Sequence, residues 1–90
     1  MYQAHFKISG RVQGVAYRFY AREKAIKLNL KGWIQNMDDG TVEATLQGAQ
    51  ESLAAFRMWA YEGAPASKVD SVEMVMQTPD EPFYTSLKIG

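Results

Sequence analysis

Strict alternation of apolar and polar residues at the start of the chain is the feature that most constrains its fold. Within residues 2–8 every second position is Tyr, Ala, Phe or Ile, and polar residues stand between them. This period of two is typical of a strand that buries one face. Val42, Ala44 and Leu46 repeat the pattern within residues 41–47. The chain is therefore expected to build a sheet with one face against a core.

Helical spacing in two other segments predicts the elements that cover this sheet. Residues 19–28 contain few strand formers, and their apolar residues recur at about one helical turn: Ala21, Ala25 and Leu28. Asn29 then suits a left-handed C-cap. Residues 50–62 repeat the helical spacing, with Leu53, Phe56 and Ala60 on one face, and Gly63 and Pro65 follow as a stop signal. Two helices are expected.

The remaining segments complete an α+β plan. Residues 32–36 read as a strand, and "MDDG" (residues 37–40) supplies the Asp-Gly turn of a hairpin to the next strand. A fourth strand is expected over residues 68–77 and a short fifth one within residues 83–89. The order is β-α-β-β-α-β, the ferredoxin-like plan, with two helices on one face of an antiparallel sheet. Its expected core includes three large aromatics: Trp33, Phe56 and Trp59.

Length and composition bound the class of protein. Ninety residues, 47% hydrophobic and 22% charged, suit one globular domain over residues 1–90. The formal net charge is zero, so long-range attraction to nucleic acid is not expected. No apolar run reaches the length of a signal peptide or a membrane span. We expect a cytoplasmic monomer that binds neither nucleic acid nor membranes.

The inventory of reactive side chains is sparse. The chain has no cysteine and one histidine, His5, so a Cys-His pair and a zinc cluster are excluded, and a Ser-His-Asp triad would need His5 as its base. His5 lies within the alternating strand and is interpreted as an ordinary residue of the sheet face. Asp38 and Asp39 are the best pair of carboxylates, but they lie in the hairpin turn, where aspartate is common for backbone reasons.

One loop stands out against this background, "GRVQGVAYR" at residues 10–18. A glycine-containing connection between a strand and a helix exposes backbone N–H groups, and the helix N-terminus adds its positive dipole end. Arg18 follows in the first helical turn, where its planar fork can bind two oxygens of a tetrahedral anion. Composition alone leaves a second interpretation open, an ordinary turn with a solvated arginine.

Two motifs together resemble a known family. "GRVQGVAYR" resembles the signature of acylphosphatases, and "GWIQNMDDGTVE" (residues 32–43) resembles that family's second signature, with weaker similarity in "GAPASKVDSV" (residues 63–72). The resemblance implies a hydrolase that cleaves the carboxyl-phosphate bond of acyl phosphates, giving a carboxylate and inorganic phosphate. It implies a small-molecule substrate, phosphate or sulfate as a product-like ligand, and direct attack by water without metal, cofactor or covalent intermediate.

The same resemblance implies a role for particular residues. Arg18 is implied to be catalytic by binding the phosphoryl group, and Asn36 by holding the attacking water. The phosphoryl group is implied to lie against the backbone amides of residues 13–18, which are Gln13, Gly14, Val15, Ala16, Tyr17 and Arg18.

The chain departs from the family pattern at two loop positions, Ala16 where glycine is usual and Tyr17 where phenylalanine is usual. A positive φ at position 16 would cost alanine about 1 kcal/mol. A degenerate enzyme that binds phosphate without turnover therefore stays open. So do an RNA-recognition motif, which shares the element order, and a small ligand-sensing or metal-carrying domain.

Overall fold

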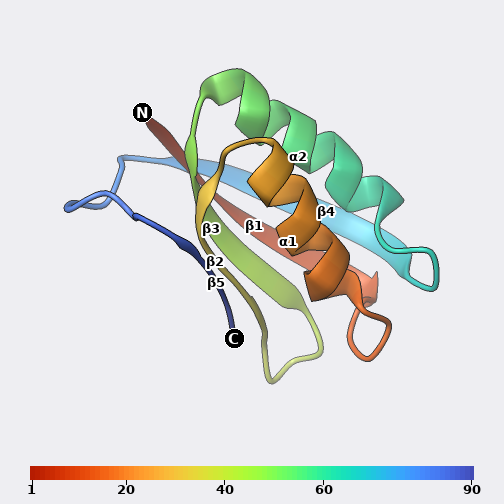
Figure 1. Ribbon diagram of the computed structural model, residues 1–90. Helices are drawn as coiled ribbons and strands as arrows, with labels where there is room; N and C mark the ends of the chain where they lie inside the picture. The colour runs from red at the N-terminus through yellow and green to blue at the C-terminus, as the bar shows by residue number, and fades with distance from the viewer.

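The computed structural model describes all residues from 1 to 90. Its elements follow the order β-α-β-β-α-β-β (Figure 1). They are β1 (Tyr2–Arg11), α1 (Tyr17–Lys27), β2 (Lys31–Asn36), β3 (Val42–Gly48), α2 (Gln50–Glu62), β4 (Lys68–Gln77) and β5 (Leu87–Ile89). None of the helices is both long and apolar enough to cross a membrane.

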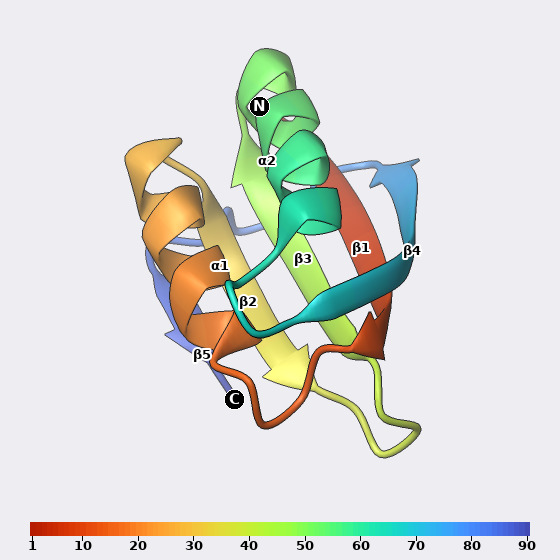
Figure 2. The ribbon, with the colours of Figure 1, turned by 90° about the vertical axis from the view of Figure 1, so that its right-hand side faces the viewer.

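A five-stranded sheet carries both helices on one of its faces (Figure 2). The strand order is β4-β1-β3-β2-β5, and the pairs among β1 to β4 are antiparallel. The ferredoxin-like α+β plan is thereby confirmed. The sheet differs from the expected one at β5 alone, because β5 pairs with β2 in parallel and makes the sheet mixed.

Sixteen buried residues form the core between the sheet and the helices. Most strand positions predicted to face inward are buried, among them Phe6, Val42 and Leu46 at 0% exposure, whereas Tyr2 at the start of β1 is 47% exposed. Small residues of α1 let that helix lie close to the sheet, since Ala21 and Ala25 are both fully buried. Rings of Phe6 and Phe56 meet edge to face at 5.0 Å between centroids.

Several sequence expectations are corrected at the ends of elements. Helix α1 begins at Tyr17, two residues earlier than expected, because the Tyr17 ring packs in the core and fixes the first turn there. Asn29 adopts the expected left-handed conformation, with φ 58°. Strand β5 is limited to three residues. Trp33 is not part of the core, since its ring lies edge-on to His5, with 5.9 Å between the ring centroids.

Buried glutamines hold the segment between β4 and β5 against the sheet. Gln47 donates to the Oε1 atom of Gln3 at 2.7 Å, and the same oxygen accepts the backbone N–H of Asp80 at 2.8 Å. The Oε1 atom of Gln47 accepts the N–H of Tyr84 at 2.8 Å. These bonds direct the chain back along β2, so that Ile89 and Gly90 arrive beside the β1–α1 loop.

Candidate active site

The β1–α1 loop and the β2–β3 hairpin lie at the same end of the sheet, and the C-terminal end of β5 approaches them there (Figure 2). The loop is anchored on the core by its apolar side chains, because Val12 is buried and Val15 packs against the core cluster. Gly14 lies between these anchors and Ala16 follows the second one, and both are exposed. Gly14 has φ 75° and Ala16 has φ 62°. The two positive φ values show that the backbone turns sharply within this short loop.

Helix α1 starts directly from this loop without a side-chain cap. Ala16 acts as the N-cap through its carbonyl oxygen, which accepts the N–H of Tyr20 at 3.2 Å. The N–H groups of the first helical turn have no acceptor within the helix. Together with the dipole they make this end of α1 suited to an anion. The first turn carries no acidic residue that could compete.

Glycine in place of Ala16 is expected to stabilise the protein. A left-handed conformation costs alanine about 1–2 kcal/mol, and glycine avoids that cost at an entropic penalty of about 0.4–1 kcal/mol in the unfolded chain. We expect Ala16→Gly to raise the free energy of unfolding by roughly 0.5–1 kcal/mol. Urea unfolding measures this change. Ala16→Val, which adds a branched side chain at the same φ, should lower the free energy, and a stabilising valine would contradict the strain.

A cleft of about 350 Å³ contains the two residues predicted to be catalytic. Its lining joins the loop, the start of α1, the end of β2 and β5: Val12, Gly14, Ala16, Tyr17, Arg18, Phe19, Asn36 and Ile89. Gln13 and Val15 belong to the same loop but do not line the cleft. The Nη1 atom of Arg18 donates a hydrogen bond to the backbone oxygen of Gly90. The guanidinium is thereby held at the cleft by a single exposed contact.

Asn36, which lines this cleft, has an unsatisfied side-chain acceptor. Its Oδ1 atom is buried and has no hydrogen-bond partner in the protein, and it is the one buried side-chain nitrogen or oxygen atom in this condition. A buried polar atom without a partner costs about 1–3 kcal/mol. Such a cost is commonly retained where the atom serves a ligand or a water molecule.

Tyr17 is structural in its side chain. Its hydroxyl donates to the carbonyl oxygen of Ala60 at 2.8 Å, and the residue is 1% exposed. Burial raises the pKa of the Tyr17 hydroxyl well above its usual value, so the group stays neutral at any physiological pH. The hydroxyl group that distinguishes Tyr17 from a phenylalanine therefore faces α2. Only the backbone of Tyr17 is available to the loop.

The side chain of Gln13 is a contact that sequence reasoning missed. Its Nε2 atom donates to the carbonyl oxygen of Met37 at 2.8 Å and to that of Thr41 at 2.9 Å. Both acceptors belong to the β2–β3 hairpin, 24 and 28 residues away. No local pattern signals such a contact, because it depends on the tertiary approach of the loop and the hairpin.

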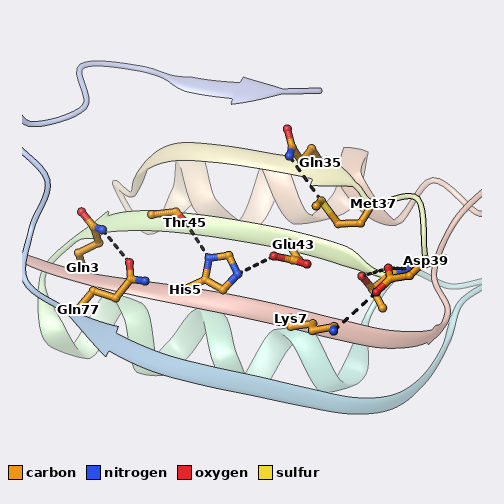
Figure 3. A network of polar contacts seen from close by, with 10 residues as sticks. Gln3, His5, Lys7, Gln35, Met37, Asp39, Glu43, Thr45 and Gln77 are labelled. Atoms are coloured by element: carbon orange, nitrogen blue, oxygen red, sulfur yellow. Dashed lines mark hydrogen bonds and ion pairs between the residues drawn. The ribbon is translucent and has the colours of Figure 1, made fainter.

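The opposite face of the sheet carries the only histidine (Figure 3). His5 lies between the Oγ1 atom of Thr45 at 2.9 Å and the Oε1 atom of Glu43 at 2.8 Å. Thr45 is only 5% exposed, so its hydroxyl is not presented to a substrate. The interpretation of His5 as a residue of the sheet face is confirmed.

The acidic turn is held in place by short contacts. Asp39 accepts hydrogen bonds from the Thr41 hydroxyl at 2.6 Å and the Thr41 N–H at 3.1 Å, which hold the pKa of its carboxyl below the usual value. Lys7 lies 3.6 Å from its other oxygen (Figure 3). Asp38 and Asp39 are exposed in the turn, as expected.

Two larger clefts contain little of the predicted site. One of about 580 Å³ lies at the other end of the sheet and has none of its residues. Another of about 450 Å³ touches Asn36 from the hairpin side and is otherwise lined by Gln35, Met37, Asp38, Asp39, Glu43 and Gly90. Only the smallest of the three clefts is lined by Asn36, Arg18 and the loop together. We therefore choose the candidate active site by its lining residues and not by its volume.

The fold and this cleft define a ferredoxin-like α+β protein with a loop suited to a small anion. A family model described as Acylphosphatase matches residues 4–89. The chain is 42% identical over 78 residues to an acylphosphatase of Thermococcus kodakarensis, covering 87% of this chain and 86% of that one. This chain belongs to the acylphosphatase family, and neither to the RNA-recognition motifs nor to the metal carriers considered above.

Solved structures agree with this assignment. The acylphosphatase of Bacillus subtilis superimposes with a TM-score of 0.94 at 33% identity, covering 100% of this chain and 99% of that one. An acylphosphatase from Coxiella burnetii gives a TM-score of 0.92 at 31% identity, with 99% and 92% covered. The expected similarity of this chain to acylphosphatases is confirmed.

Proposed function

We propose that this protein hydrolyses acyl phosphates to a carboxylate and inorganic phosphate in the cleft between the β1–α1 loop and the end of β2. The observation that carries the proposal is the unpartnered Oδ1 atom of Asn36, a residue that lines the same cleft as Arg18 and the anion-suited loop. Membership of the acylphosphatase family supports the same reaction.

The phosphoryl group is proposed to lie against the backbone amides of residues 13–18 and the guanidinium of Arg18. Phosphoryl transfer is catalysed mainly by positioning and by stabilising charge on the equatorial oxygens. Fixed N–H groups and one guanidinium supply that stabilisation without reorganisation during the reaction. The contact of Arg18 with the Gly90 oxygen is exposed, so a dianion can replace it.

Asn36 is proposed to orient the attacking water. Its Oδ1 atom accepts a hydrogen bond from the water, which turns a lone pair toward phosphorus. A carboxamide is not a strong base, so a phosphoryl oxygen takes the proton. The leaving carboxylate has a conjugate acid with a pKa of about 4, and it departs at neutral pH without a general acid. The reaction therefore needs no histidine, metal or covalent intermediate.

The proposed substrate class follows from the small cleft. A site that binds mainly the phosphoryl group accepts small acyl phosphates, with phosphate or sulfate as product-like ligands. We propose that residues 1–90 act as one domain and as a cytoplasmic monomer that binds neither nucleic acid nor membranes.

Release of phosphate from acetyl phosphate, measured with and without EDTA, tests this function. We expect turnover that saturates with substrate, is inhibited competitively by inorganic phosphate and is unchanged by the chelator. Turnover abolished by EDTA would contradict the proposed chemistry. Binding of phosphate without turnover would leave a degenerate anion-binding protein and would contradict catalysis.

A further inference from the structure

The Gln13 carboxamide connects the β1–α1 loop to the β2–β3 hairpin, two parts of the site that lie on different strands of the sheet. The anion-suited loop lies between β1 and α1, whereas Asn36 ends β2 on the other side of β3 in the sheet order. Gln13 reaches across this separation, and its Nε2 atom donates to the carbonyl oxygens of Met37 and Thr41 at 2.8 and 2.9 Å. Met37 directly follows Asn36 in the chain.

The acceptors of Gln13 are themselves fixed. The Thr41 carbonyl oxygen also accepts the N–H of Met37 at 2.8 Å, which closes the hairpin. The Oδ1 atom of Asp39 also accepts hydrogen bonds from the hydroxyl and the backbone N–H of Thr41. The hairpin is therefore a rigid frame, and both protons of the Gln13 amide group are used on it. A side chain that only filled space would not need two aligned acceptors.

We propose that Gln13 is a positioning residue, which sets the distance between the loop that binds the phosphoryl group and the carboxamide that orients water. This inference rests on the proposed function, because it assigns a task within that reaction. The Nε2 atom of Gln13 donates both of its N–H groups to backbone oxygens, so the proposal gives its side chain no direct contact with the phosphoryl group. Gln13 acts through Asn36, by fixing the strand end from which Asn36 projects.

The expected effect lies in turnover rather than in anion binding. The loop is also anchored by Val12, Val15 and Tyr17, so its amides keep their arrangement when the Gln13 amide is removed. The approach of water to phosphorus loses its fixed geometry, and a misplacement of about 1 Å can cost ~10²-fold in rate. We expect kcat to fall more than the affinity for phosphate.

Two variants of similar size separate the donor from the bulk of the side chain. Gln13→Met keeps the length but cannot donate, and it is expected to lower kcat on acetyl phosphate about 10-fold or more while the inhibition constant of inorganic phosphate changes less than about 3-fold. Gln13→Glu places an anionic acceptor against two carbonyl oxygens, so its loss at neutral pH should be larger. An equal loss of phosphate affinity and kcat would overturn the inference.

Acidification distinguishes a hydrogen-bond donor from a structural side chain. A protonated carboxylic acid donates, and the two carbonyl acceptors favour that form, so the pKa of the introduced glutamate should lie above its usual value of about 4.3. The kcat ratio of Gln13→Glu to Gln13→Met should rise at least ~3-fold between about pH 7 and pH 4.5. A ratio that does not change with pH would count against the proposed donor.

A double substitution tests whether Gln13 acts through Asn36. In the Asn36→Ala background, Gln13→Met is expected to cost less than about 2-fold in kcat, since the group that it positions is gone. Full multiplication of the two losses would contradict the coupling.

Gln35→Met is the matched control, because Gln35 precedes Asn36 and its Nε2 atom lies 3.5 Å from the Met37 sulfur (Figure 3). It should retain kcat within about 2-fold. Circular dichroism and urea unfolding test whether each variant is folded. If Gln13→Met is not, the kcat ratio of Gln13→Glu to the wild type decides, and it should rise between about pH 7 and pH 4.5. Failure of the wild-type protein to hydrolyse acetyl phosphate would remove the function itself, whereas an active wild type with unaffected Gln13 variants would remove only this inference.

Discussion

Arg18→Ala is expected to lower kcat/KM on acetyl phosphate at least ~10²-fold, the loss typical of removing an arginine or an oxyanion donor from a phosphoryl or acyl transfer site. Arg18 is the cation of the cleft, and in the proposed reaction its planar fork supplies two parallel donors to the phosphoryl oxygens. Because the guanidinium contacts substrate and transition state alike, the inhibition constant of inorganic phosphate should rise together with the loss of rate. Steady-state kinetics with phosphate as inhibitor measures both.

Two further variants make the Arg18 result specific. Arg18→Lys keeps a positive charge without the planar fork, so it should recover only part of the activity. Arg22→Ala removes a cation one helical turn further along α1, where Arg22 lies 3.9 Å from Glu23 on the exposed surface. Its activity should stay within about 2-fold of the wild type. Full activity of Arg18→Ala would show that the phosphoryl group binds elsewhere.

Asn36→Ala is expected to lower kcat about 10²-fold while the inhibition constant of phosphate changes little. The reason is the proposed division of tasks in the cleft, in which the loop and Arg18 bind the anion and Asn36 orients the water. The same substitution should not weaken the fold. It removes a buried acceptor without a partner, and the free energy of unfolding is expected to rise by about 1 kcal/mol.

A lower kcat together with a higher free energy of unfolding in Asn36→Ala would distinguish a catalytic role of Asn36 from a structural one. An asparagine that serves only as a turn former would lose stability and keep activity on replacement by alanine. Urea unfolding and steady-state kinetics on the same preparation measure both quantities. A large loss of phosphate affinity would instead place Asn36 among the anion-binding groups.

The order of elements was predictable because each strand and helix has its own periodicity, and the Asp-Gly turn fixes the hairpin register. The start of α1 at Tyr17 was missed because no sequence pattern indicates that the Tyr17 side chain is buried in the core. The parallel pairing of β5 was not predictable either. It depends on the bonds of Gln3 and Gln47 to the segment that precedes it, and side chains 44 residues apart carry no local signal.

The site shows the same division. The loop and Arg18 were singled out by glycine spacing and helix-end electrostatics, and Asn36 by resemblance to a family motif. Sequence alone could not reveal that the Asn36 oxygen lacks a partner or that Gln13 reaches the hairpin, because both depend on burial and on the approach of two distant segments. From the sequence, Ala16 is strained only if its φ is positive. The structure gives a φ of 62° at this residue.

Single-turnover hydrolysis of acetyl phosphate in water enriched in ¹⁸O tests most directly whether the cleft brings water to phosphorus. In the proposed reaction the amides, Arg18 and Asn36 bring water to the phosphoryl group, so mass spectrometry should find one ¹⁸O atom in the released phosphate and none in the acetate. Label in the acetate would mean attack on the carbonyl carbon, and it would contradict the roles given to Arg18 and Asn36.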